Sequence, residues 1–378
     1  MRFTNLLFVT LLTIISVQAQ QVETLVTGPS TFNDGLVLDS KGNIYASRYY
    51  SNTVTKIVRD GTTSIFASGF SDPNGMVMDA NDTLYVTSAS GNRIDKIAPD
   101  GTKSILISGI ENPTSLVFDA DSNLLVTQYQ LSRISKIDSA GIVTSFMTGQ
   151  GLNGPVGMNY DEAGNLYIGN FNDGKILKRT PEGDVSVIGD IPGWMGFSTY
   201  SNGYIYATGF QQHKIYRIAT DGSEQIVYAG TGGSGNKDGE LDEATFNGPN
   251  GIVASVTGDT LFISDFESRS LRMITGVLSN STNSEIERSG PENFNLHQNF
   301  PNPFNPSTTI NFDVKRASDI IISVFDLNGR IILELVNAFY NSGSYSVDFD
   351  ATNLASGTYI YEMRSPDFVK TKTFTLIK

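Results

Sequence analysis

Hydrophobic and polar residues alternate with a period near two along most of this chain, in short runs separated by Gly, Asn and Asp. The clearest copy of the pattern has four runs, at residues 73–79 (PNGMVMD), 83–87 (TLYVT), 93–97 (RIDKI) and 103–108 (KSILIS). The next copy has its runs at residues 113–119, 124–127, 133–137 and 143–147. Alternating runs rich in β-branched and aromatic residues are typical of β-strands. Each copy therefore predicts a unit of four short strands.

The copies recur at a steady spacing. The equivalent positions in their first runs are Gly35, Gly75, Ser115, Gly157, Gly196 and Gly251. A period of roughly 40 residues with four strands in each unit is typical of a β-propeller blade. The last interval is longer because it contains a Gly-rich insertion at residues 231–246.

The ends of the repeat region predict how the ring closes. The sixth copy has only three runs, at residues 251–254, 260–264 and 270–274, and residues 23–27 resemble the missing fourth run. We therefore predict an all-β fold with a six-bladed propeller, in which the N-terminal strand closes the last blade and removes exposed sheet edges. An open solenoid is the alternative, and it would leave an incomplete unit at each end.

Strand direction alternates within a blade, which divides the loops between two faces. The Asp-Gly hairpins and the turns between first and second strands belong to one face, which we call the bottom. The loops between blades and those between second and third strands belong to the other, the top face. Asp-rich turns can bind calcium, but the regular hairpin position favours a plain turn for these.

Residues on the top face differ from blade to blade, and such departures from a repeat are where a site can form. The candidate ligand-binding residues there are Asp34, Arg48, Asn74, Asn170, Trp194, Asn250 and Asp265. Some precede the first-strand positions, others follow the second strands, and the only Trp lies in a loop between blades. An ion pair between Asp265 and Arg48 that staples the ring is the alternative to ligand contact for these two residues.

Three segments resemble the NHL-repeat and gluconolactonase/regucalcin-like six-bladed propellers, namely residues 249–253 (PNGIV), 261–265 (LFISD) and 270–274 (SLRMI). In the gluconolactonase-like enzymes a divalent cation at the channel mouth polarises a lactone carbonyl. The resemblance implies Asp34, Asn74 and Asn250 as metal ligands, for Ca²⁺ or another divalent cation. The positions of the family's remaining ligands hold Val156 and Met195. We assign no catalytic residue, and whether the chain is an enzyme stays open.

Histidine chemistry is restricted in this chain. NHL-like lyases use a His-rich centre with zinc, but this sequence contains only two histidines, His213 and His297. A site with three histidines is therefore impossible, and His-dependent acid–base chemistry in the propeller could rest only on His213.

Composition excludes several kinds of partner. The formal net charge is -13, whereas phosphate binding needs clustered Lys and Arg. We therefore expect no nucleic-acid partner and no binding to an anionic membrane surface. The chain has no Cys, which excludes disulfides and thiolate metal sites.

Residues 1–19 are predicted to be a signal peptide, because Arg2 precedes a short apolar stretch that ends at small residues before position 20. No other segment is long and apolar enough to cross a bilayer, so we expect no membrane span in the mature chain. Residues 20–278 would then form the propeller and the polar residues 279–293 a linker. Alternating runs within residues 294–378 predict a small Ig-like β-sandwich.

A distinctive run lies at residues 298–310 (QNFPNPFNPSTTI). Together with residues 324–330 (VFDLNGR), 354–361 (LASGTYIY) and 371–374 (TKTF), it resembles the type A C-terminal sorting domain of the type IX secretion system. The resemblance implies handling by that machinery and a secreted or cell-surface location. An ordinary Ig-like accessory domain, such as a glycan binder, is the alternative.

These observations favour a secreted propeller that binds an unidentified small molecule, glycan or protein at its top face. A metal-dependent, gluconolactonase-like hydrolase is the alternative function. A structural or adhesive surface protein is a third possibility.

Overall fold

The computed structural model describes residues 20–27, 34–58, 60–277, 294–314, 318–327, 329–340, 343–365 and 368–377. The chain forms two compact units, residues 1–280 and 281–378. The expected signal peptide and the expected linker lie outside the described residues. No helix within these described ranges is long and apolar enough to span a membrane.

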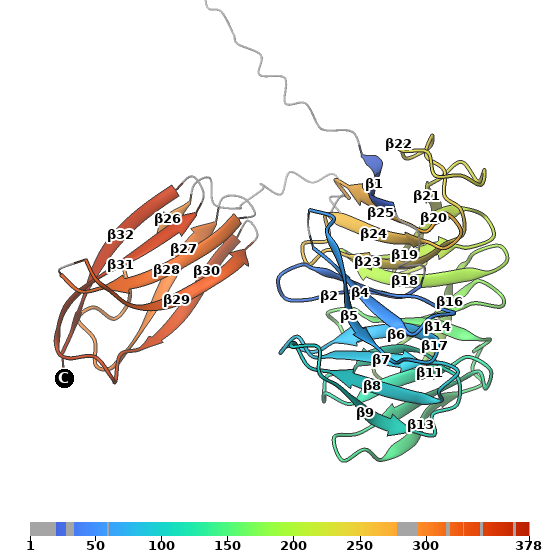
Figure 1. Cartoon of the computed structure of the whole chain (residues 1–378), viewed down its shortest axis with the longest axis horizontal. Helices are drawn as coiled ribbons and strands as arrows, with labels where there is room; N and C mark the ends of the chain where they lie inside the picture. Colours follow the sequence, from blue (N-terminus) through green and yellow to red (C-terminus); the bar gives the residue numbers. More distant parts are fainter. Residues whose placement is uncertain are drawn as a thin grey trace, which may run out of the picture. The chain divides into compact units, whose positions relative to one another are not determined.

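The strands of the first unit form six sheets within the described residues, and each sheet is one blade of a propeller (Figure 1). Blade one contains β2 (Leu36–Leu38), β3 (Ile44–Ser47), β4 (Thr53–Ile57) and β5 (Thr63–Ser68). Blade two contains β6 (Pro73–Met78), β7 (Leu84–Ser88), β8 (Arg93–Ile97) and β9 (Lys103–Ser108). Blade three contains β10 (Pro113–Phe118), β11 (Leu124–Gln128), β12 (Arg133–Ile137) and β13 (Val143–Thr148).

The second half of the ring follows the same plan. Blade four contains β14 (Pro155–Tyr160), β15 (Leu166–Asn170), β16 (Lys175–Arg179) and β17 (Val185–Asp190). Blade five contains β18 (Met195–Ser201), β19 (Tyr204–Gly209), β20 (Lys214–Ala219) and β21 (Gln225–Ala229). Blade six contains β23 (Pro249–Ala254), β24 (Thr260–Asp265), β25 (Ser270–Thr275), β1 (Gln21–Thr27) and β22 (Gly239–Glu240). The predicted six-bladed propeller is confirmed.

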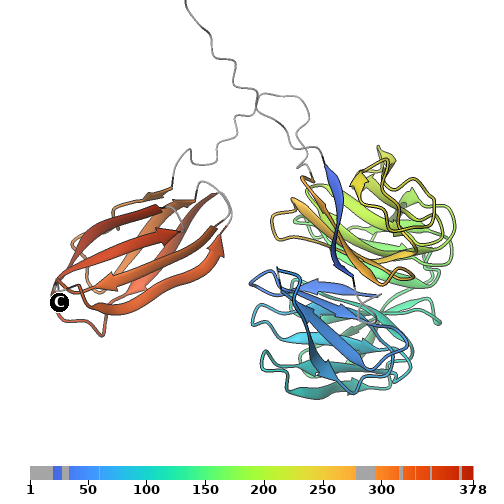
Figure 2. The ribbon, with the colours of Figure 1, turned by 45° about the horizontal axis from the view of Figure 1, so that its top comes forward.

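The ring closes as the sequence predicted. β1 pairs antiparallel with β25, with Val22 opposite Ile274, and in Figure 2 the dark blue β1 lies beside the orange strands of the last blade. The innermost strands β2 and β23 also contact each other, so blades one and six are neighbours. The open solenoid is therefore wrong.

The sequence did not predict a fifth strand in the last blade. The Gly-rich insertion contributes β22, which pairs with the outer edge of β1. The fully buried Arg272 holds this insertion, because its guanidinium donates to Asp238 Oδ1 at 2.8 Å and to the carbonyl oxygen of Thr245 at 2.9 Å. Asp238 in turn accepts hydrogen bonds from the backbone N–H and the hydroxyl of Thr24 in β1. The insertion thus covers an edge that would otherwise be open to pairing.

The repeated glycines permit close approach of neighbouring blades. A Cβ on Gly251 would clash with the backbone carbonyl of Asp34 in the next blade, and one on Gly75 would clash with that of Thr114. Hydroxyls of the second strands brace the same carbonyls: Ser264 Oγ donates to Asp34 O at 2.7 Å. These hydrogen bonds fix the backbone around the channel mouth, which carries candidate site residues such as Asp34.

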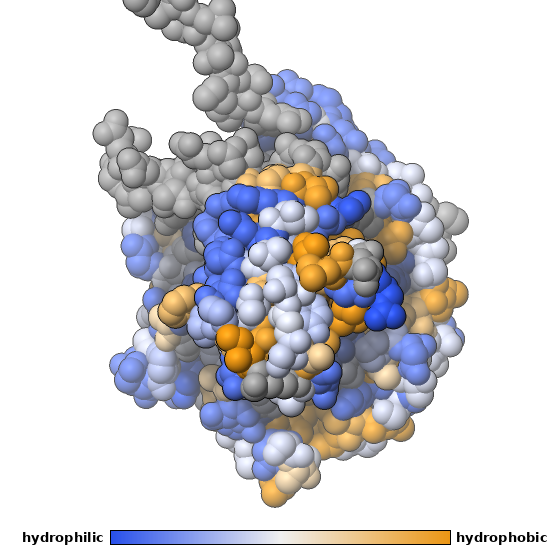
Figure 3. Space-filling view, turned by 90° about the vertical axis from the view of Figure 1, so that its left-hand side faces the viewer, coloured by the Kyte–Doolittle hydropathy of each residue, from blue (hydrophilic) through white to orange (hydrophobic). Residues whose placement is uncertain are grey.

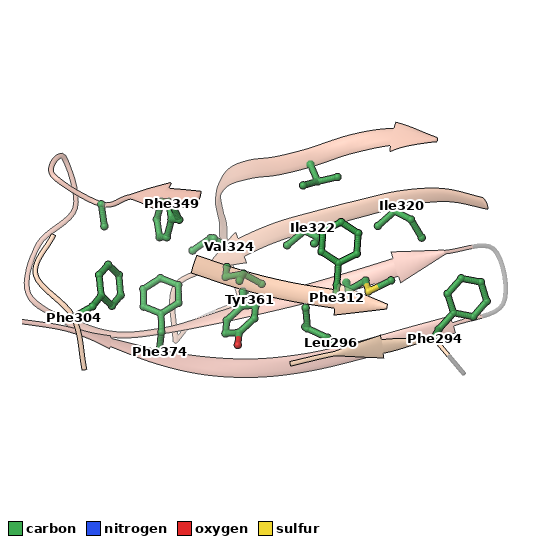
Figure 4. Close-up of a cluster of buried hydrophobic side chains, with 14 of the residues drawn as sticks. Phe294, Leu296, Phe304, Phe312, Ile320, Ile322, Val324, Phe349, Tyr361 and Phe374 are labelled. Atoms are coloured by element: carbon green, nitrogen blue, oxygen red, sulfur yellow. The ribbon is translucent and has the colours of Figure 1, made fainter. Parts of the chain in front are cut away.

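The second unit is a β-sandwich of two sheets. One sheet contains β26 (Asn295–Leu296), β27 (Ser307–Val314) and β30 (Gly343–Asp350). The other contains β29 (Ile331–Tyr340), β28 (Ser318–Phe325), β31 (Gly357–Ser365) and β32 (Phe368–Leu376). Alternate residues of both sheets meet in a single core in which Phe312 and Phe374 are fully buried (Figure 4). On the face of this unit turned to the viewer in Figure 3, hydrophobic patches lie among hydrophilic residues.

Candidate functional site

The top face of the propeller contains a pocket of about 450 Å³. Asp34, Asn74, Trp194 and Asn250 from the sequence-predicted set all line it. Its floor comes from residues that precede the innermost strands or begin them. Its wall comes from the loops that follow the second strands and from Trp194, in the loop before β18. A second pocket of about 340 Å³ extends along the innermost strands, and Phe197 lines both.

Asp34 is the acidic group of this pocket. Its side chain is buried, and its Oδ1 accepts a hydrogen bond of 2.8 Å from Nδ2 of Asn250. Burial raises the pKa of the Asp34 carboxyl to about 8, although the Asn250 hydrogen bond acts in the opposite direction. The carboxyl is therefore mostly protonated near neutral pH when nothing else neutralises it.

Asn74 lines the same pocket and presents an unsatisfied acceptor. Its Oδ1 is buried and has no hydrogen-bond partner within the described residues. Its backbone is fixed, because Ser47 Oγ donates to the Asn74 carbonyl oxygen at 2.6 Å. Buried acceptors normally have a donor, and their exceptions point to an unoccupied partner position such as a water, ion or ligand.

Aromatic side chains form most of the pocket wall. The seven that come from the loops are Tyr49, Tyr50, Tyr129, Phe171, Trp194, Phe210 and Phe266. They contact one another in pairs, as Phe171 stacks on Trp194 with ring centroids 5.5 Å apart, and Phe210 meets Phe266 at 5.6 Å. The Trp194 side chain is 46% exposed, so part of its ring remains open to a ligand.

The sequence analysis did not predict most of these aromatic residues, because it selected positions one residue earlier in the chain. It selected the residue after each predicted second strand, whereas in five of the six blades the next residue is the one that lines the pocket. These next residues are Tyr49, Ala89, Tyr129, Phe171, Phe210 and Phe266, so an aromatic recurs in five of the six blades. In five blades the first set ends the second strand and the second set begins the turn that follows, so the two side chains point in different directions. An aromatic at this fixed repeat position was the signal that could have found them.

Asn170, which the sequence placed in the site, points away from the pocket. Its fully buried side chain accepts a hydrogen bond from the backbone N–H of Asn153 at 3.0 Å and donates to the carbonyl of Gly151 at 2.8 Å. It therefore clamps the loop before blade four. Arg48 is half-buried and also does not line the pocket.

Asp265 has the same clamping role in the last blade. Its fully buried carboxylate accepts from the backbone N–H of Asn247 at 2.8 Å and from Ser268 Oγ at 2.8 Å. Burial raises its pKa to about 6. Among the ion pairs of the described residues, its partner is Arg272 at 3.8 Å and not Arg48. The suggested Asp265–Arg48 staple is therefore wrong.

The two histidines lie outside the pocket. His213 ends the turn that precedes β20, and its Nδ1 accepts a hydrogen bond of 3.0 Å from the backbone N–H of Gly248. His297 belongs to the sandwich, where its Nε2 lies 2.5 Å from Asp313 Oδ2. Both side chains have local structural partners.

The donor set fits a divalent cation poorly. Asp34, Asn74 and Asn250 share the pocket, but only one of them is a carboxylate, and Asn250 turns its Nδ2 toward Asp34. Calcium needs six to eight oxygen ligands, and the rest of the wall is mostly aromatic. Within the described residues, no three His, Asp or Glu side chains are grouped to hold a metal. The metal set stays a prediction, and we derive no catalytic step from it.

Comparison with known proteins agrees with both resemblances. Residues 11–189 match the profile of the Virginiamycin B lyase family, and residues 298–377 match that of the secretion system C-terminal sorting domain. No curated protein sequence matches the chain. The sorting domain makes this a secreted or cell-surface protein that the type IX machinery handles.

Solved structures share the propeller fold. An auxiliary nutrient binding protein from Bacteroides thetaiotaomicron is 17% identical with a TM-score of 0.60, covering 68% of this chain and 77% of that one. A gluconolactonase from Xanthomonas campestris is 15% identical with a TM-score of 0.54, covering 67% and 89%. The virginiamycin B lyase of Staphylococcus aureus is 19% identical with a TM-score of 0.50, covering 68% and 98%. At these identities the likeness concerns the fold.

Proposed function

We propose that this exported propeller binds a small organic ligand in the top-face pocket and does not transform it. The observation that carries the proposal is the convergence of aromatic side chains from five blades on one pocket. Aromatic rings supply rigid, largely apolar contact area at low conformational cost. A binding role is compatible with the auxiliary nutrient binding proteins that share the fold.

The pocket's chemistry favours binding over catalysis. Asp34 is the only carboxyl among its lining residues, and no His, Lys or Arg lines it within the described part of the chain. Acid–base catalysis in this pocket would therefore rest on Asp34 and on the tyrosine phenols of the wall. The wall otherwise offers ring faces and amide groups.

Mutation of the wall tests this proposal. The full chain is screened by thermal shift against a panel of aromatic, amine and saccharide compounds, and hits are measured by calorimetry. Phe171→Ala should weaken every hit about tenfold, the effect expected from losing roughly 1.4 kcal/mol of ring contact. Tyr200→Ala is the matched control, because Tyr200 lines the other pocket. Hits that bind Phe171→Ala and the unmodified protein equally would contradict the proposal.

The gluconolactonase-like hydrolase remains the second candidate, favoured by the meeting of Asp34, Asn74 and Asn250 in one pocket. Its test is hydrolysis of a lactone panel with calcium present. Activity that EDTA and Asp34→Ala both abolish would support the hydrolase and overturn the binding proposal.

A further inference from the structure

The pocket holds a buried acid that no basic side chain neutralises. Asp34 is only 3% exposed, and none of the lining residues is Lys, Arg or His within the described ranges. A carboxylate removed from water is costly unless a cation pairs with it, and otherwise it takes up a proton. The side chains that line the pocket therefore supply no positive charge to pair with Asp34, and a cationic ligand could supply it.

The same floor lacks a hydrogen-bond donor. Asn74 Oδ1 is buried without a partner, and Asp34 and Asn74 come from neighbouring blades. A Cβ on Gly35 would lie 2.7 Å from the backbone carbonyl of Asn74, so the two segments are in contact there. A ligand that donates hydrogen bonds can satisfy Asn74, whereas a ligand with only acceptors leaves it unsatisfied.

The aromatic wall distinguishes an organic cation from a metal ion. The faces of Trp, Tyr and Phe attract ammonium groups through the ring quadrupole. Calcium instead requires a shell of oxygen ligands that this wall does not provide. The acidic surroundings also favour a cation. Burial raises the pKa of the Tyr49 phenol, and the charges of Asp72 and Asp34 raise it further. The whole chain carries a formal net charge of -13.

We propose that the pocket binds an organic ammonium ion, a primary or secondary amine whose nitrogen lies against Asp34 and Asn74 and whose apolar body lies between the aromatic rings. The inference rests on the proposed binding function and specifies its ligand class. The ammonium supplies both the missing positive charge and the missing N–H donors.

Three probes of similar size test the class on the full chain: 2-phenylethylammonium, neutral 2-phenylethanol and anionic 3-phenylpropanoate. Calorimetry should show the ammonium binding about tenfold or more tightly than the alcohol, with the carboxylate weakest. Asp34→Asn should remove the preference for the ammonium while the alcohol still binds, since the new amide can still accept from Asn250. Asp100→Asn, a fully exposed hairpin position, is the matched control and should keep the preference.

A second variant keeps the test decisive if Asp34→Asn does not fold. Asn74→Leu removes the unpartnered acceptor and should weaken the ammonium several-fold with little effect on the alcohol. Cellobiose serves as a saccharide probe. If the alcohol, the carboxylate or cellobiose binds as tightly as the ammonium or more tightly, the ammonium class is overturned and the proposed binding function still stands. Calcium that binds and displaces the ammonium would also overturn it, in favour of a metal centre. If no compound of the wider panel binds either, the proposed function itself fails.

Discussion

Aromatic side chains gather in both units of this protein, but they differ in burial. In the sandwich, Phe312 and Phe374 are completely buried in a single core. In the propeller mouth, Phe171, Phe210 and Phe266 are half-buried and line an open pocket. Ring area that is already buried stabilises the fold, whereas ring area left at a pocket wall is available to a ligand. The comparison separates residues for stability from residues for recognition.

The largest effect is expected in the sandwich core. Phe374→Ala should lower the unfolding free energy of the C-terminal unit by about 3–5 kcal/mol, because it leaves a cavity at a fully buried position. Urea unfolding followed by circular dichroism measures this loss. Trp194 fluorescence follows the propeller separately, since it is the only Trp. Ile331→Ala, at a 61% exposed position in the same unit, is the control. An equal loss in both variants would contradict the assignment of this core.

The next effect concerns the contact that lets the blades approach. Gly251→Ala should destabilise the propeller by about 1–3 kcal/mol, because the added Cβ collides with the backbone carbonyl of Asp34. Trp194 fluorescence during urea unfolding measures the change. Gly233→Ala is the control, as the nearest atom to its added Cβ is at an ordinary contact distance of 3.4 Å. A Gly251→Ala protein as stable as this control would show that the mouth can widen freely.

A smaller effect on stability is expected at the mouth itself. Phe210→Ala should cost about 1 kcal/mol, because Phe210 is half-buried and loses mainly its edge contact with Phe266. Its larger consequence should be weaker ligand binding, measured by calorimetry. A stability loss as large as that of Phe374→Ala would remove the contrast between the two aromatic groups.

The last effect differs in kind, because it is a dependence of stability on pH. The pKa of Asp34 in the folded protein is about 8, above its ordinary value of 3.8, so the folded state holds the proton more tightly than the unfolded state. Its stabilising contribution is complete below about pH 4 and is lost as pH rises to about 8. Asp34→Asn should flatten the decline between these values in urea unfolding. Asp100→Asn should leave the slope from pH 6 to 8 unchanged, because the pKa of Asp100 is lowered.

The sequence was informative wherever structure repeats. The spacing of Gly35, Gly75 and Gly251 predicted the blades because each glycine solves the same packing problem between neighbours. The short N-terminal run predicted ring closure because only one blade lacked a strand. The sorting domain was identified in another way, by the resemblance of motifs such as residues 298–310 to a known family.

The site was only partly predictable, because side-chain direction changes at every residue of an extended segment. Asp34 and Asn74 line the pocket. Asn170 and Asp265 instead bind loop backbone, whereas Phe171 and Phe266 line the pocket. Arg272 and β22 were missed because they depend on contacts between the insertion and a strand at the other end of the propeller sequence. Periodicity contains no information about such contacts.

The pairing of β1 with β25 also limits when the propeller can close during synthesis. The first strand of the propeller to be synthesised pairs with the last, so almost the whole propeller must be present before Val22 can meet Ile274. Contacts between such distant segments form slowly, and until then the last blade has an open edge. The sorting domain follows β25 in the chain. A chain that carries the sorting domain, the signal for outer-membrane passage, therefore already contains every strand needed to close the ring. The order of the two units along the sequence thus excludes incomplete propellers from this signal.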